Sequence, residues 1–131
     1  MASLKEGYDF LRDRGIISED IPKVILENLN PNFKLREYQK EAIARFEYHL
    51  TDNKRIFPTQ LLFHMATGSG KTLLMASNII SLYKKGYRNF LFFVNSNNII
   101  KKTKDNFLNK ESSKYLFNDK WESHRFKSCG I

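Results

Sequence analysis

The sequence predicts an α/β fold in which parallel strands are joined by crossover helices and preceded by N-terminal helices. Two short, nearly continuous apolar runs, TQLLFHM at residues 59–65 and NFLFFVN at residues 89–95, have the pattern of strands that are covered on both faces. A helical pattern follows each run. The order strand, helix, strand, helix predicts right-handed crossovers in a parallel sheet. A weaker third strand candidate is KYLF at residues 114–117.

Residues 1–34 are expected to form a helical extension. LKEGYDFLRDR at residues 4–14 has a helical apolar period and ends at Gly15. A second helix is expected to begin at Ser18, a good N-cap residue, and to stop at NPN, residues 30–32. Acidic residues that suit the positive end of a helix follow the expected N-cap: Glu19 and Asp20.

Three further helices are expected in residues 35–131. LREYQKEAIARFEYHL at residues 35–50 has one apolar face, and polar Gln39 falls inside that face. The helix after the first strand is expected over residues 71–85, because a pair of lysines and then a glycine close it. The last is expected over residues 97–108.

Length and composition restrict the class of protein. A chain of 131 residues, 41% of them hydrophobic, allows one folded lobe. No apolar run approaches the roughly 20 residues that span a bilayer, and the first ten residues lack the layout of a signal peptide, so we expect no membrane partner and a cytoplasmic location. Cys129 is the sole cysteine, which excludes an internal disulfide and a cysteine-based zinc site.

The net charge of +8 is concentrated in the C-terminal part of the chain. Residues 1–83 carry eleven Lys and Arg against ten Asp and Glu, whereas residues 84–131 carry eleven against four, a balance of +7. This bias favours a polyanionic partner, nucleic acid first, although a solvated surface rich in lysine would have the same composition.

The residues MATGSGKT, 65–72, follow the first predicted strand and lead into a predicted helix. They match the P-loop pattern G-x-x-x-x-G-K-[ST] except that Met65 replaces the first glycine. Such a loop wraps phosphate oxygens with backbone amides, and the residues expected to bind nucleotide here are Thr67, Gly68, Ser69, Gly70, Lys71 and Thr72. We expect Lys71 to contact the β- and γ-phosphates and the Thr72 hydroxyl to ligate Mg²⁺, so these two are also the predicted catalytic residues.

Three elements in order, LREYQKEAI at 35–43, MATGSGKT at 65–72 and FLFFVNSNNIIKKTKDNF at 90–107, resemble the start of a superfamily 2 helicase-like ATPase, a relative of the DEAD/DEAH-box proteins. The resemblance is closest to the restriction subunits of type III and type I restriction enzymes. It implies that residues 35–131 form part of a RecA-like ATP-binding lobe that stops before the Asp-Glu motif. It also implies ATP and Mg²⁺ as cofactors, and DNA with modification or specificity subunits of a restriction system as partners.

The resemblance assigns two of these elements to ligands. In the first, the glutamine reads adenine, which implies this role for Gln39, and Arg36 lies where it could contact the base. A carboxamide can donate to adenine N7 and accept from its N6 amine, although a core glutamine bonded to backbone groups would show the same pattern. In the third element, the implied contacts with the sugar-phosphate backbone are Ser96, Asn97 and Lys101, while Ser96 and Asn97 also suit a plain helix N-terminus.

Hydrolysis by this family also requires an Asp-Glu motif and arginines from a second lobe. No Asp is followed directly by Glu anywhere in the 131 residues. We therefore expect the N-terminal, ATP-binding segment of a DNA translocase or helicase, whose parent is an ATPase while this chain alone is inactive. Two alternatives stay open, a non-hydrolysing module that binds nucleotide or nucleic acid, and an unrelated P-loop enzyme such as a small kinase.

Overall fold

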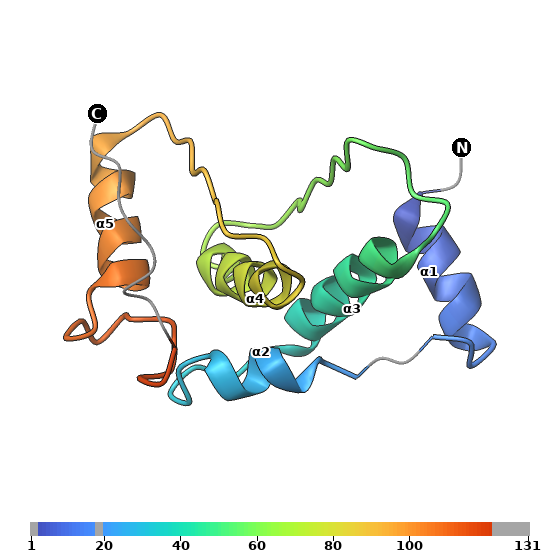
Figure 1. Cartoon of the computed structure of the whole chain (residues 1–131), viewed down its shortest axis with the longest axis horizontal. Coiled ribbons are helices and arrows are strands. Elements are labelled where there is room, and N and C mark those ends of the chain that lie inside the picture. Colours follow the sequence, from blue (N-terminus) through green and yellow to red (C-terminus); the bar gives the residue numbers. More distant parts are fainter. Residues whose placement is uncertain (1–2, 18–19, 122–131) are drawn as a thin grey trace.

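A computed structural model describes residues 3–17 and 20–121 of the chain. This part contains helices α1 (Leu4–Asp13), α2 (Lys23–Asn28), α3 (Glu37–Thr51), α4 (Lys71–Lys84) and α5 (Asn97–Leu108). Helices α3 and α4 lie in the middle, and α3 packs on both α4 and α1, while α2 packs across α4 (Figure 1). Helix α5 lies at the opposite end of the molecule from α1.

The first helix is defined by local capping. The Ser3 hydroxyl oxygen accepts a hydrogen bond from the Glu6 amide at 3.2 Å, and the Glu6 carboxylate accepts one from the Ser3 amide at 2.7 Å. This reciprocal arrangement satisfies donors that the helix itself leaves unpaired. After α1, Gly15 takes a positive φ of 66°, which residues with a Cβ rarely adopt. The helix expected over residues 4–14 is confirmed.

Helix α2 begins later than the sequence predicts. The predicted N-cap, Ser18, and Glu19 lie outside the described residues, and Asp20 precedes the helix rather than joining its first turn. The N-cap is Pro22, and the first helical residue is Lys23. The expected start was wrong because proline disfavours helical backbone in the residue before it, so a helix cannot readily run through Ile21 into Pro22.

The core lies where α4 meets α2, α3 and the segment after α5. Helix α4 contributes Leu74, Ala76 and Ile80, all buried. Aromatic rings close the other side, since Phe117 packs edge-on against Phe107 and stacks on Trp121, with centroid distances of 5.5 Å in both pairs. Phe117 and Trp121 belong to the same buried cluster as Ile25 and Leu29, so the chain after α5 packs against the N-terminal part of the protein.

The segment at 114–117 pairs with the N-terminal extension. A single antiparallel bridge joins Leu29 and Phe117, flanked by hydrogen bonds from the Asn30 amide to the Leu116 carbonyl at 2.9 Å and from the Asn118 amide to the Asn28 carbonyl at 2.8 Å. The weak strand candidate is thus a bridge to residues just after α2.

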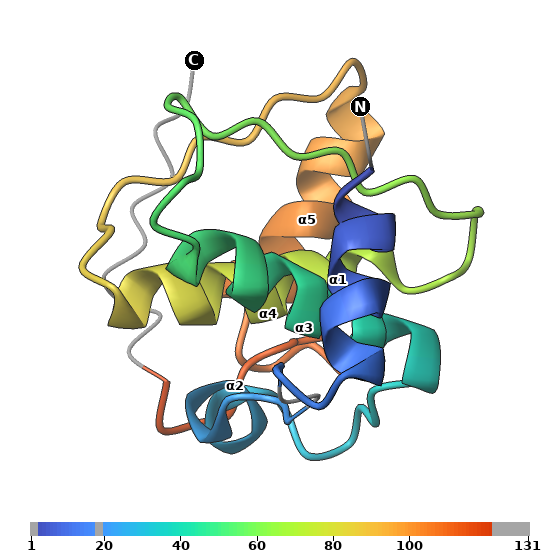
Figure 2. The same cartoon turned by 90° about the vertical axis from the view of Figure 1, so that its right-hand side faces the viewer.

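The runs at 59–65 and 89–95 are not strands, in contrast to the expectation, and the described residues contain no β-sheet. Both runs pass on the same side of α3 and α4, the upper side in Figures 1 and 2. Side-chain burial still alternates along residues 61–65: Phe63 is half-buried against α3, whereas Leu62 is 92% exposed. Strands become stable when a neighbouring strand satisfies their backbone groups, and in the part of the chain that the structure describes no strand ladder includes either run. The parallel sheet and the RecA-like lobe remain predictions.

Within residues 3–17 and 20–121, no helix combines the length and apolar character that crossing a bilayer requires.

Candidate nucleotide site

The first turn of α3 contacts the glycine-rich loop directly. Gln39 is only 2% exposed, and its Nε2 donates to the carbonyl oxygens of Ser69 at 3.0 Å and Gly70 at 3.4 Å. Its Oε1 accepts from the Arg36 amide at 2.9 Å. A polar side chain on an apolar helix face is therefore paired with backbone groups, as burial of an amide requires. Gln39 and the loop, expected to share one site, lie together.

Tyr38 makes a second link to the same turn of the loop. Its hydroxyl donates to the Ser69 carbonyl at 2.7 Å and accepts from Nη1 of Arg36 at 3.1 Å. The Arg36 guanidinium is thus linked to the loop indirectly, through the Tyr38 hydroxyl. Sequence reasoning missed Tyr38 because an exposed tyrosine outside the apolar face gives no periodic signal, and its partner lies 31 positions away.

Two loop glycines have positive φ, 76° at Gly68 and 81° at Gly70. A Cβ at Gly70 would lie 2.4 Å from Nε2 of Gln39, whereas a Cβ at Gly68 would meet nothing within 4 Å. Glycine at position 70 therefore meets two requirements, left-handed backbone and close approach of the glutamine. Such bare backbone is also what lets amides approach a phosphate group.

The Lys71 side chain folds back over the loop. Its Nζ donates to the carbonyl oxygens of Met65 at 3.1 Å and Ala66 at 2.9 Å, and the Ser69 hydroxyl donates to the same Ala66 carbonyl at 2.6 Å. The ammonium group is exposed, so these contacts can be exchanged for an anion without desolvating a buried charge.

Helix α4 begins directly after the loop. Its first backbone bonds run from the Leu73 and Leu74 amides to the Gly70 carbonyl, at 3.0 and 3.1 Å. The amides of Lys71 and Thr72 precede them and belong to the donors that a helix start leaves without intrahelical partners. These donors and the helix dipole give this end of α4 a partial positive charge that favours an anion.

A pocket of about 300 Å³ lies beside the loop. The predicted residues that line it are Arg36, Gln39, Gly68, Ser69, Gly70 and Thr72. Thr67 is exposed and Lys71 points across the loop, and neither is part of the lining. The lining also includes residues that the sequence patterns did not single out: Asn32, Phe33, Lys34, Leu73 and Leu116.

The predicted nucleic-acid contacts lie on α5 and outside this pocket. Ser96 is the N-cap of α5, as expected, but its side chain makes no capping hydrogen bond. Asn97 and Lys101 are exposed, in the first and second turns of the helix. Their side chains are accessible to a partner, while nothing in their geometry selects a nucleic acid.

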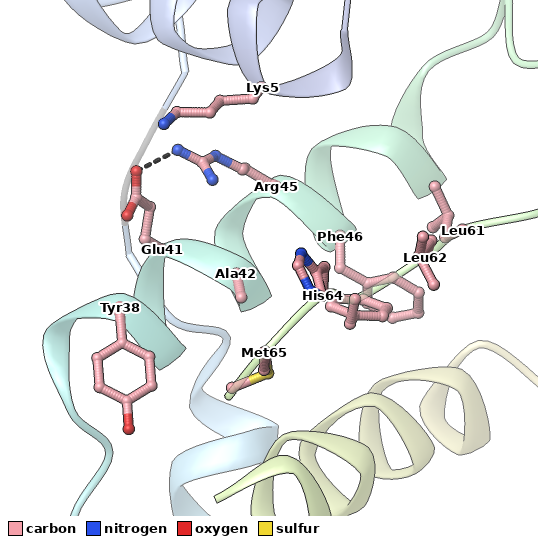
Figure 3. A pocket seen from close by; sticks show the side chains of 11 residues that line it. Lys5, Tyr38, Glu41, Ala42, Arg45, Phe46, Leu61, Leu62, His64 and Met65 are labelled. Carbon is pink, nitrogen blue, oxygen red and sulfur yellow. Dashed lines mark hydrogen bonds and ion pairs between the residues drawn. The ribbon is translucent and has the colours of Figure 1, made fainter. Parts of the chain in front are cut away.

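A second pocket, of about 310 Å³, lies between α3 and residues 61–65 (Figure 3). Met65 and Tyr38 reach it from the glycine-rich loop and from the first turn of α3. Its charged rim holds Arg45, which pairs with Glu41 and, at 3.4 Å, with Asp9.

Comparison with known proteins identifies the family of this chain. Residues 32–128 match the family model described as type III restriction enzyme, res subunit. The chain belongs to this family. The resemblance to restriction subunits drawn from the three sequence elements is thereby confirmed. The matched range includes the first turn of α3, the glycine-rich loop and α5.

One relative is the probable type III restriction-modification enzyme HindVIP Res subunit of Haemophilus influenzae, which is 39% identical over 135 residues. The match covers 92% of this chain, whereas the chain spans about a quarter (26%) of the relative. No solved structure matches the chain.

Proposed function

We propose that this chain is the ATP-binding segment of a nucleic-acid-dependent ATPase, a DNA translocase or helicase of a type III restriction enzyme. The observation that carries the proposal is the contact between the first turn of α3 and the phosphate loop, where Gln39 meets the carbonyls of Ser69 and Gly70 at the start of α4. Gln39, the proposed adenine reader, and residues of the glycine-rich loop line one pocket, which supports the proposal.

The phosphate end of this site comprises the loop amides, Lys71 and Thr72. The Lys71 ammonium would exchange the carbonyls of Met65 and Ala66 for phosphate oxygens. Thr72, half-buried in the pocket lining, offers its hydroxyl as a ligand to Mg²⁺. When bound, Mg²⁺ neutralises charge on the phosphates.

The base end of the site is formed by Gln39. One lone pair of its Oε1 accepts from the Arg36 amide, which leaves the other for the N6 amine of adenine. Guanine has an acceptor, O6, where adenine has this amine, so the same carboxamide disfavours GTP.

DNA is the proposed partner of the C-terminal part of the chain, together with modification or specificity subunits of the restriction system. Exposed lysines of α5 include Lys101, Lys102 and Lys104, which lie within residues 84–131, the part of the sequence with a balance of +7. Contacts of this kind bind phosphates without reading bases.

The 131-residue chain is not expected to turn over ATP by itself. The groups that position Mg²⁺ and water are missing from its sequence, and an arginine supplied from another lobe is worth about 10³–10⁵ in rate. Phosphate release with single-stranded or duplex DNA should equal that of the Lys71→Ala variant. DNA-stimulated release that disappears in the variant would show that an acid within the chain, such as Asp119, completes the site.

Equilibrium binding of fluorescent ATP in the presence of Mg²⁺ tests the proposal. Lys71→Ala should weaken binding of ATP and GTP alike by at least tenfold, as expected for loss of a charged hydrogen-bond donor. Lys84→Ala is the matched control, because it removes the same charge at the other end of α4. Equal affinities of the two variants, or no binding by the unmodified chain, would refute the site.

A further inference from the structure

The Ser69 carbonyl accepts two hydrogen bonds from neighbouring side chains of one helical turn. The Tyr38 hydroxyl donates at 2.7 Å and the Gln39 amide at 3.0 Å. A carbonyl oxygen has two lone pairs, so both are used here by α3. Two hydrogen bonds from α3 therefore hold this turn of the glycine-rich loop.

The hydrogen bonds of Gln39 conflict with its role as an adenine reader. Its Nε2 donates to the loop, to the carbonyl of Ser69 at 3.0 Å and to that of Gly70 at 3.4 Å. A carboxamide that donates to adenine N7 must release one of these carbonyls. The Gly70 carbonyl would keep the Leu73 and Leu74 amides as donors. The half-buried Ser69 carbonyl is therefore the one whose loss of a donor would cost free energy, which would be subtracted from the binding of adenine.

We propose that Tyr38 is a positioning residue that holds the Ser69 carbonyl while the Gln39 amide turns to adenine. The inference rests on the proposed function, since it assigns Tyr38 a role in base selection at that site. With the Tyr38 bond in place, release by Gln39 leaves Ser69 paired and the loop unmoved. Without the Tyr38 hydrogen bond, adenine and the Ser69 carbonyl compete for the hydrogens of the Gln39 amide.

Arg36 fixes the direction of the Tyr38 hydroxyl. Its guanidinium donates to the phenolic oxygen at 3.1 Å, so the hydroxyl hydrogen is free to point at Ser69 rather than at Arg36. The Arg36 guanidinium can only donate and the Ser69 carbonyl can only accept, so the Tyr38 hydroxyl accepts from the first and donates to the second. Arg36 therefore acts on base selection through Tyr38.

The test is Tyr38→Phe, which removes the hydroxyl and keeps the ring. The ratio of GTP to ATP dissociation constants should fall about threefold to tenfold, the effect of one net hydrogen bond. In a Gln39→Ala background, the same change should leave the ratio unaltered, because no amide then moves between loop and base. Arg36→Ala should lower the ratio less than Tyr38→Phe does, since the hydroxyl remains.

A residue that only stabilised the loop would lower the affinities for ATP and GTP by the same factor. Equal losses in Tyr38→Phe, or a changed ratio that persists without Gln39, would overturn the proposal while the nucleotide site stands. Absence of any nucleotide binding by the unmodified chain would instead refute the proposed function. Thermal unfolding of each variant confirms that the compared proteins are folded.

Discussion

Gly70→Ala perturbs the glycine-rich loop in two separable ways. Left-handed backbone at φ 81° costs a residue with a Cβ about 1–2 kcal/mol. In addition, the new Cβ would lie 2.4 Å from Nε2 of Gln39 and displace that amide from the carbonyls of Ser69 and Gly70. Each lost bond is worth about 0.5–1.5 kcal/mol, with the 3.4 Å bond to Gly70 at the lower end. The free energy of unfolding should therefore fall by about 2–4 kcal/mol.

Gly68→Ala is the matched control. It has nearly the same φ, 76°, but open space around the added Cβ, so it should cost about 1–2 kcal/mol. Urea denaturation measures both variants, and both should also be made in a Gln39→Ala background, where the difference between them should disappear. Equal losses of unfolding free energy for Gly68→Ala and Gly70→Ala in the chain that retains Gln39 would refute the close approach of Gln39 to Gly70.

Two other predictions concern the core and the basic surface. Ile80→Ala should lower the free energy of unfolding by about 2–5 kcal/mol, because Ile80 is wholly buried, whereas Leu62→Ala should change it by less than about 0.5 kcal/mol. Urea denaturation that gave similar values would contradict this packing. Charge reversal at Lys101, Lys102 and Lys104 should reduce the salt dependence of single-stranded DNA binding, by about 2 in the log–log slope if all three contact phosphates. An unchanged slope would exclude α5 from the interface.

Local rules predict most of the helical structure. The helices expected over 4–14, 35–50, 71–85 and 97–108 agree with α1, α3, α4 and α5 to within two residues at each end, because capping and apolar periodicity depend on neighbours in the sequence. The start of α2 differs from the expectation because Pro22 disfavours helical backbone in the residue before it, although Ser18 is a favourable N-cap residue type.

Contacts between distant residues could not be predicted in the same way. The pattern places Gln39 on an apolar face, yet only the fold shows that Ser69 and Gly70 are its partners. The sequence pattern does not single out Tyr38, because its partner, the Ser69 carbonyl, lies 31 positions away. Strand pairing is likewise non-local, so the apolar runs at 59–65 and 89–95 predict β-structure without specifying what pairs with them.

Base selection by Gln39 is the most direct test of an adenine-nucleotide site. Titration calorimetry should compare ATP and GTP binding to the unmodified chain and to Gln39→Ala. A carboxamide that pairs with adenine is worth about 1–3 kcal/mol of discrimination, so the unmodified chain should prefer ATP by about 5- to 150-fold and the variant by little or nothing. Equal losses of ATP and GTP affinity in Gln39→Ala would show that Gln39 only holds the loop, and would contradict the assignment.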